Sequence, residues 1–151
     1  MLSGTTTLVG LLRHPLKDSL SPRMQNAAFE AAGLDGVTRR VAFDGKGATI
    51  LLFFLSGCPT CHKMIPEWNR IYLRRPPGLQ VIGVLMDREP PGFFQTMPVA
   101  FPVLRSPGPG FLRSYKVSRA PLTLRVGPGG KVEDVGLGLL DPIRIGQIFR
   151  P

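Results

Sequence analysis

The stretch "LLFFLSGCPTCHKMIPEW", Leu51–Trp68, decides how the rest of the chain is interpreted. Its apolar first half predicts a strand at Thr49–Leu55 that is covered on both faces and lies centrally in a sheet. Its second half carries apolar residues at helical spacing and predicts a helix that is kinked at Pro66. The only two cysteines of the chain, Cys58 and Cys61, therefore fall where a buried strand passes into a helix.

Three kinds of site can contain the sequence Cys-Pro-Thr-Cys-His. C-x-x-C is the dithiol of redox proteins, C-x-x-C-H is the attachment site of a c-type haem, and a short Cys/Cys/His cluster can bind zinc. Zinc is the weakest candidate, because the chain has only two histidines and His14 lies far upstream of His62. Haem attachment needs a haem-sized pocket among helices, whereas this motif follows a buried strand.

The strand-to-helix junction favours the dithiol. It places Cys58 at the N-terminus of the helix, where unpaired N–H groups and the helix dipole favour a thiolate. A Cys58 thiolate would attack a disulfide, and Cys61, one turn further along, would then attack Cys58 and release the reduced substrate. Pro59 suits the first helical position, where it costs no hydrogen bond.

The remaining elements alternate between strands and helices, as in an α/β domain. The first is a strand at Thr6–Leu12, followed by a helix that begins near Ser21 and ends at Gly33. Further along, the pattern predicts a run of β residues before "DGKG", a buried strand at Leu79–Asp87, a short helix around Phe93–Met97, one or two helical turns in "GFLRSYKV", a hairpin with "GPGG" at its tip, and a terminal helix capped by Asp141 with Pro142 at its first position.

Length and charge restrict the class of protein. The chain has 151 residues, enough to build one core without disulfides. The net charge of +9 is scattered in short pairs with no run of five basic residues, so nucleic-acid binding is not favoured. The start lacks a basic n-region, and its apolar run is too short for a signal peptide or a membrane span. As written, the sequence predicts a soluble cytoplasmic protein with no transmembrane segment.

Residues 44–140 resemble the thioredoxin-like thiol-disulfide oxidoreductases of the TlpA/ResA kind. The resemblance rests on "ILLFFLSGCPTCHKMIPEW", "LQVIGVLMD" and "YKVSRAPLTLRVGPGGKV". The Cys-Pro-Thr-Cys version is also similar to the methylamine-utilisation branch. The resemblance implies a thioredoxin-like fold, a central mixed β-sheet flanked by helices. It also implies that Pro121 is a cis-proline facing the cysteines, and that Ala120 and Pro121, with Pro59 and Thr60, bind the substrate.

This resemblance implies no cofactor and no metal, and partners that are protein thiols or disulfides or a thiol reductant. The sequence departs from it at Met64, where many relatives carry a glutamate that helps to move protons. Similar proteins are also often exported. The direction of the redox function and the partner protein do not follow from the motif.

Residues 5–35 resemble a different family, the start of shikimate dehydrogenase, in which a serine pair, here Ser19 and Ser21, binds the substrate carboxylate. We find no glycine-rich dinucleotide loop, since "GPGG" lies in a predicted hairpin. We therefore interpret residues 1–40 as an N-terminal βα segment that packs on, or is appended to, a thioredoxin-like domain at residues 41–151.

The sequence thus predicts a thiol-disulfide oxidoreductase with Cys58 and Cys61 as catalytic residues. Two alternatives stay open at this point. One is an electron-transfer module that carries a covalent haem through "CPTCH", and the other is a non-catalytic interaction domain of thioredoxin fold.

Overall fold

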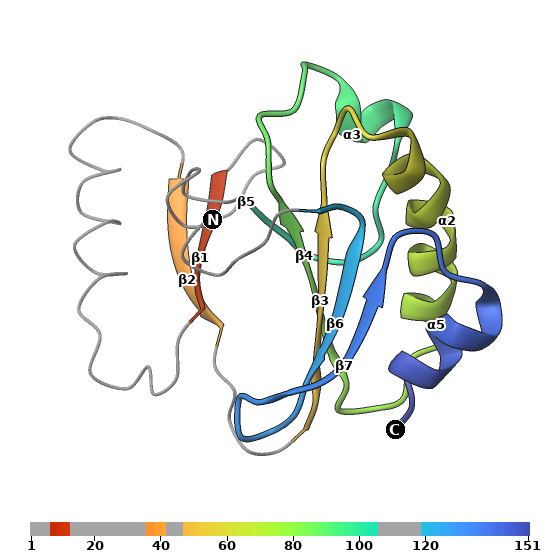
Figure 1. Cartoon of the computed structure of the whole chain (residues 1–151). Coiled ribbons are helices and arrows are strands. Elements are labelled where there is room, and N and C mark those ends of the chain that lie inside the picture. Colours follow the sequence, from red (N-terminus) through yellow and green to blue (C-terminus); the bar gives the residue numbers. More distant parts are fainter. Residues whose placement is uncertain (1–6, 13–35, 42–46, 106–118) are drawn as a thin grey trace.

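A computed structural model describes residues 7–12, 36–41, 47–105 and 119–151 of the chain. In the central part of the chain, strands and helices alternate as expected for an α/β protein (Figure 1). In chain order they are β1 (Thr7–Leu12), β2 (Gly36–Val41), β3 (Thr49–Phe54), α2 (Pro59–Leu73), β4 (Gln80–Leu85), α3 (Phe93–Thr96), β5 (Val103–Arg105), β6 (Leu122–Val126), β7 (Val132–Leu137) and α5 (Pro142–Ile148). The predicted helix near residues 21–33 and the turns in "GFLRSYKV" lie outside the described residues.

The described strands form one mixed sheet in the order β2-β1-β5-β4-β3-β6-β7. Strands β3, β4 and β5 run parallel to one another, and β6 runs antiparallel to β3. The carboxyl ends of β3, β4 and β5 and the start of β6 therefore lie at one edge of the sheet. The loop with Cys58 begins at this end of the strands.

Strand β3 is buried along its whole length because both faces of the sheet are covered there. Ile50, Leu52 and Phe54 belong to one core cluster, which also holds the buried residues of α2 and α5. Leu51 and Phe53 belong to a second cluster on the other face. Helices α2 and α5 lie on the same side of the sheet (Figure 1). The predicted mixed sheet flanked by helices is confirmed.

Helix α2 begins and ends where the sequence predicts. Cys58 is its N-cap, Pro59 stands at its first position, and Arg74 caps its C-terminus just before the Pro-Pro-Gly segment. The helix continues through Pro66, which is exposed. On its inner face Trp68 packs edge-on against the rings of Phe54 and Phe101, which anchors the helix to the sheet.

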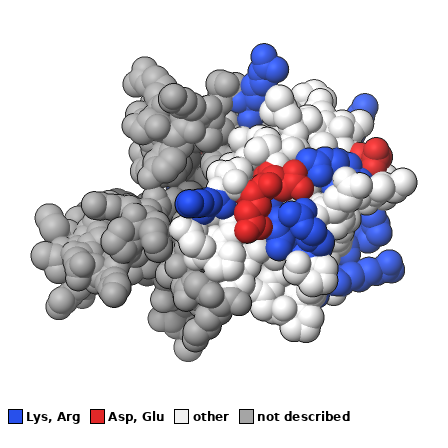
Figure 2. All heavy atoms as spheres, turned by 60° about the horizontal axis from the view of Figure 1, so that its bottom comes forward, with Lys and Arg blue, Asp and Glu red and all other residues white. Residues whose placement is uncertain are grey.

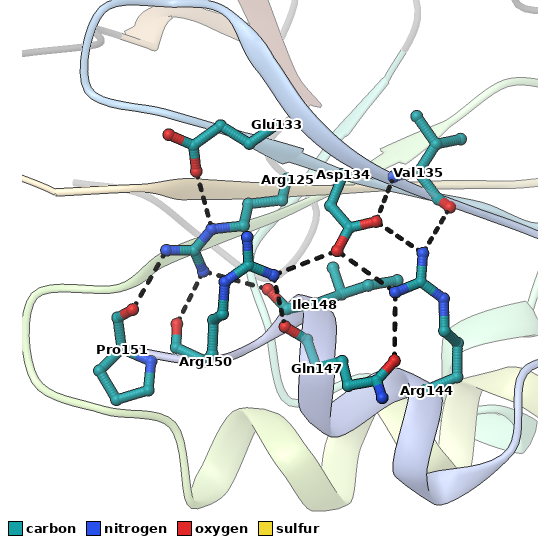
Figure 3. A network of polar contacts seen from close by, with 9 residues as sticks. All are labelled: Arg125, Glu133, Asp134, Val135, Arg144, Gln147, Ile148, Arg150 and Pro151. Carbon is teal, nitrogen blue, oxygen red and sulfur yellow. Dashed lines mark hydrogen bonds and ion pairs between the residues drawn. The ribbon is translucent and has the colours of Figure 1, made fainter.

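The predicted hairpin and terminal helix are present as β6, β7 and α5. Asp141 caps α5 by accepting a hydrogen bond from the N–H of Arg144 at 2.8 Å. Figure 3 shows how the end of the chain is held to the hairpin. The buried guanidinium of Arg125 donates to the carboxylate of Glu133 and to the backbone carbonyls of Ile148, Arg150 and Pro151. Arg125 pairs with Ile50 at the start of β3, so this network lies at the end of the sheet opposite Cys58.

The sequence predicts only a short helix between Arg88 and Gly110, but the structure also contains strand β5 there. β5 has three residues and stands between prolines, so it carries no periodic pattern. Its place is decided by pairing, since it lies beside β4 and contacts β1 through the pair Val9–Arg105. The run of β residues before "DGKG" forms β2. This strand pairs in parallel with β1 at the edge of the sheet and is not a neighbour of β3.

Charged side chains of both signs share the surface in Figure 2. On the face shown there, Asp and Glu side chains gather at the centre and Lys and Arg side chains border them. Among the described residues, Asp134 forms ion pairs with both Arg144 and Arg150. In the parts of the chain that the structure describes, no helix has the length and apolar character needed to span a membrane.

Candidate active site

Cys58 lies in the loop between β3 and α2, with its backbone extended and its side chain half-buried. Its sulfur accepts a hydrogen bond from the backbone N–H of Cys61, with 3.1 Å between nitrogen and sulfur. A donor at this position stabilises negative charge on Sγ more than it stabilises the neutral thiol. The expected position of Cys58 at the helix N-terminus is therefore present.

Cys61 lies one turn inside α2 and is completely buried in the core cluster. Burial, followed by the hydrogen bond with Cys58, raises the pKa of the Cys61 thiol to about 12. The negative charges of Cys58 and Asp87 act in the same direction. The two cysteines, both free thiols here, thus differ sharply in exposure and surroundings.

The Ala120–Pro121 peptide lies beside the cysteine pair and is cis, as the family resemblance implied. The Sγ atom of Cys58 is 3.9 Å from the carbonyl oxygen of Ala120, to which a thiol can donate weakly. Pro121 is buried and Ala120 is half-buried, while Pro59 is exposed and Thr60 is half-buried at the start of α2. The structure thus brings Ala120 next to Cys58, at the same edge of the sheet as Pro59 and Thr60.

The loop before Cys58 is held by the side chains of Asp87 and His62, neither of which the sequence assigns to the dithiol site. The carboxylate of Asp87 accepts from the backbone N–H of Ser56 at 2.8 and 3.1 Å and from its hydroxyl at 2.8 Å. His62 Nε2 lies 2.5 Å from the carbonyl oxygen of Ser56. The sequence carries only a partial signal, a polar residue at the end of each of two apolar runs, and only the pairing of β3 with β4 shows that Ser56 and Asp87 meet.

The residue that replaces the glutamate of many relatives is part of the core. Met64 is completely buried, and its sulfur accepts a hydrogen bond from the backbone N–H of Leu140 at 3.3 Å. A thioether cannot take a proton from Cys61 at neutral pH. The carboxylate whose charge acts on Cys61 is instead Asp87, which comes from the end of β4.

The geometry around the two cysteines does not favour haem attachment through "CPTCH". A thioether bond to haem needs an accessible sulfur, whereas that of Cys61 is buried, and the His62 ring is turned toward Ser56 and lies against Phe93. Within the described residues, no group of three or more His, Cys, Asp and Glu side chains is placed to hold a metal ion. The site contains a pair of thiols, of which Cys58 is half-buried and Cys61 is buried.

Solved structures with a similar fold include proteins of thioredoxin type. StoA from Bacillus subtilis superposes with a TM-score of 0.62 at 18% identity, covering 70% of this chain and 84% of that one. The exposed lipoprotein thioredoxin of Streptococcus pneumoniae gives a TM-score of 0.61 at 21% identity, covering 71% and 85%. A secreted disulfide oxidoreductase of Mycobacterium tuberculosis gives 0.59 at 16% identity, covering 71% and 82%. These likenesses confirm the thioredoxin-like fold.

Curated relatives match a different and shorter part. Shikimate dehydrogenase (NADP(+)) from Methanobrevibacter smithii is 57% identical over 35 residues, and that from Rubrobacter xylanophilus is 56% identical over 36 residues. These matches cover 23% and 24% of this chain, and the chain spans only 12% and 13% of the two enzymes. The local resemblance noted in the sequence is therefore real but brief, and Ser19 and Ser21, which it singled out, lie outside the described residues.

A family model matches most of the chain. The Redoxin model aligns with residues 21–141, which include both cysteines, the Ala120–Pro121 peptide and every described strand from β2 to β7. Together with the thioredoxin-like fold, this match assigns the family: the chain belongs to the redoxin family.

Proposed function

We propose that this protein exchanges disulfides with protein or small-thiol partners through Cys58 and Cys61. The observation that carries the proposal is the asymmetry of the pair. Cys58 is half-buried and receives a hydrogen bond from the N–H of Cys61, whereas the Cys61 thiol is buried and has a raised pKa. Cys58 is therefore the nucleophile, and Cys61 is the thiol that resolves the mixed disulfide.

The reaction then proceeds in two balanced exchanges. The Cys58 thiolate attacks one sulfur of the substrate disulfide, a Cys58–substrate disulfide forms, and the other substrate sulfur leaves and takes up a proton. Cys61 then attacks Cys58 Sγ and loses its proton, the Cys58–Cys61 disulfide forms, and the second substrate thiol leaves with a proton. Two electrons pass from the protein to the substrate, and the reverse sequence oxidises a dithiol.

We assign the substrate groove to Ala120 and Pro121 on one side and to Pro59 and Thr60 on the other. The position of the Ala120 carbonyl next to Cys58 supports this assignment. A polypeptide that enters in an extended conformation can pair with the Ala120 backbone while its disulfide meets Cys58. Such a groove suits protein thiols and disulfides.

Trapping tests the assignment of the two cysteines. Cys61→Ser should accumulate a mixed disulfide with a substrate such as oxidised insulin, because nothing resolves it. Cys58→Ser should neither turn over nor trap. Trapping by Cys58→Ser instead would reverse the two roles. If the parent protein, with both cysteines, does not reduce insulin, the domain is non-catalytic. The equilibrium of the Cys58–Cys61 disulfide with glutathione then gives the direction of the reaction.

A further inference from the structure

The loop that presents Cys58 is fastened at a single residue from two sides. Ser56 is buried and lies two positions before Cys58. Its N–H and hydroxyl both donate to the Asp87 carboxylate, and its carbonyl faces the His62 ring. Every polar group of Ser56 is thus engaged by a side chain from outside the loop. We call Ser56, Asp87 and His62 the loop clamp.

The sheet itself brings Asp87 to Ser56. Strands β3 and β4 are paired in register from Thr49–Gln80 to Phe54–Leu85, and the pairing continues as the Met86 N–H donates to the Phe54 carbonyl at 2.9 Å. Two residues beyond the last pair, Ser56 stands opposite Asp87. Since hydrogen bonds to a carboxylate are stronger than neutral ones, this contact extends the rigid strand pair into the loop.

His62 completes the clamp from the helix side. A carbonyl oxygen can only accept, so His62 Nε2 carries the proton and donates to Ser56. The backbone N–H of the same residue donates to the Cys58 carbonyl at 3.1 Å, in the first turn of α2. His62 therefore ties both Ser56 and Cys58 to the turn of the helix that contains Cys61.

We infer that Asp87 and His62 are positioning residues for thiol-disulfide exchange, which act through Ser56 to keep Cys58 Sγ at the Cys61 N–H and beside Ala120. This inference rests on the proposed function. Cys58 Sγ has Ala120 O and Cys61 N as its hydrogen-bond partners, whereas Asp87 and His62 contact Ser56, so each acts on the reacting atom through the loop. Gly57, between Ser56 and Cys58, is exposed and has no packing of its own to fix the chain there.

The clamp also has an electrostatic part. The charge of Asp87 is one of the influences that hold Cys61 in its protonated form, after burial and the hydrogen bond with Cys58. The charged or titratable groups around Cys61 are then Cys58, Asp87 and, next in sequence, His62. Removing the Asp87 charge should therefore ease the ionisation of Cys61 even where the loop stays in place.

The test measures attack by Cys58 alone. In a Cys61→Ser background, the rate of mixed-disulfide formation with oxidised glutathione is compared for Asp87→Ala, Asp87→Asn, His62→Leu and His62→Gln. Because a displacement of about 1 Å at a reacting centre can cost about a hundredfold, Asp87→Ala and His62→Leu should slow the attack roughly 10- to 100-fold. His62→Gln, whose amide can still donate to Ser56, should restore most of the rate.

Glu89→Gln is the matched control. This carboxylate lies on the same segment as Asp87 but pairs with Arg105 and not with Ser56. Its loss should leave the attack rate within about twofold of the parent value, since it removes an ion pair of the same segment without touching the clamp. Thermal unfolding of each variant separates a loss of folded protein from a loss of rate.

A second measurement guards against a purely structural effect. In proteins that keep Cys61, Asp87→Asn should move the pH midpoint of Cys61 alkylation downward, because a negative charge nearby is lost, and Glu89→Gln should not. Folded Asp87→Ala and His62→Leu proteins with attack rates within twofold of the parent would overturn the inference. Failure of the proposed function would appear elsewhere, as a parent protein that does not turn over a protein disulfide.

Discussion

The buried thiol of Cys61 gives a prediction whose size follows from its surroundings. Its pKa is raised from 9.0 to about 12, first by burial and then by the hydrogen bond with Cys58. Each pKa unit changes the thiolate fraction tenfold at a pH below both values, so Cys61 near neutral pH should hold about a thousandfold less thiolate than an ordinary thiol. Alkylation of Cys61 should be slower by at least that factor, because the sulfur is also shielded from the reagent.

The assay follows each cysteine separately. Reduced protein is treated with iodoacetamide at about pH 7.5, and peptide mass spectrometry gives the modified fraction of Cys58 and Cys61 with time, with the urea-unfolded chain as reference. Cys58 should react first in the folded protein. Cys61 should react about a thousandfold more slowly than it does in the unfolded chain.

Replacement of Cys58 by alanine then separates the two main causes of the raised Cys61 pKa, burial and the neighbouring Cys58. Cys58→Ala removes the hydrogen bond and the neighbouring charge but leaves the burial, so it should restore only part of the thousandfold. Recovery of the whole factor would show that Cys58, and not burial, dominates. Alkylation of Cys61 in the folded parent within tenfold of the unfolded rate would refute the reasoning altogether.

Three further predictions concern parts of the molecule away from the cysteines. Arg125→Met leaves the buried carbonyl of Ile148 and the other acceptors of Arg125 in Figure 3 without their donor. It should lower the free energy of unfolding, measured by urea titration, by about 2–4 kcal/mol and leave disulfide exchange unchanged. Arg70→Met, at an exposed ion pair, is the control and should have little effect. Hydrogen bonding by Arg144 lowers the pKa of Asp134 from 3.8 to about 2, so its stabilisation is present above pH 3.8 and is lost as the pH falls through 2. Asp134→Asn should therefore destabilise at neutral pH and make little difference below pH 2, and an equal effect at both would disprove this origin. Finally, we propose that residues 1–40 pack as an integral βα segment; deleting them should lower the melting temperature, since β5 loses β1 as its neighbour, and an unchanged value would make the segment an appendage.

The sequence by itself determined the local features around the cysteines. A continuous apolar run can only be a segment covered on both faces, and β3 is one. Helical spacing after the motif, with Pro59 at the first position, fixed the start of α2 and so placed Cys58 at its N-terminus. The hairpin with "GPGG" at its tip and the Asp141 cap were also readable, because turn and cap preferences act between residues close in the chain.

Only the tertiary structure decided which of these elements are neighbours. β5 is too short to show a period, and it is a strand because β4 and β1 supply its hydrogen-bond partners. In the sequence, Arg125 is simply a basic residue in a predicted strand. In the structure, the backbone carbonyls of Ile148 and Arg150 accept its hydrogen bonds and allow its charge to be buried.

The loop clamp shows the same division within the site. Cys58 and Cys61 stand three positions apart, at the N-cap and in the first turn of α2, and this spacing alone brings them together. Ser56 and Asp87 are 31 residues apart and meet only because β3 and β4 pair in parallel and in register. Spacing along the chain fixes contacts within a turn, whereas the contact that holds the Cys58 loop depends on how two strands pair, and no local pattern of residues encodes that choice.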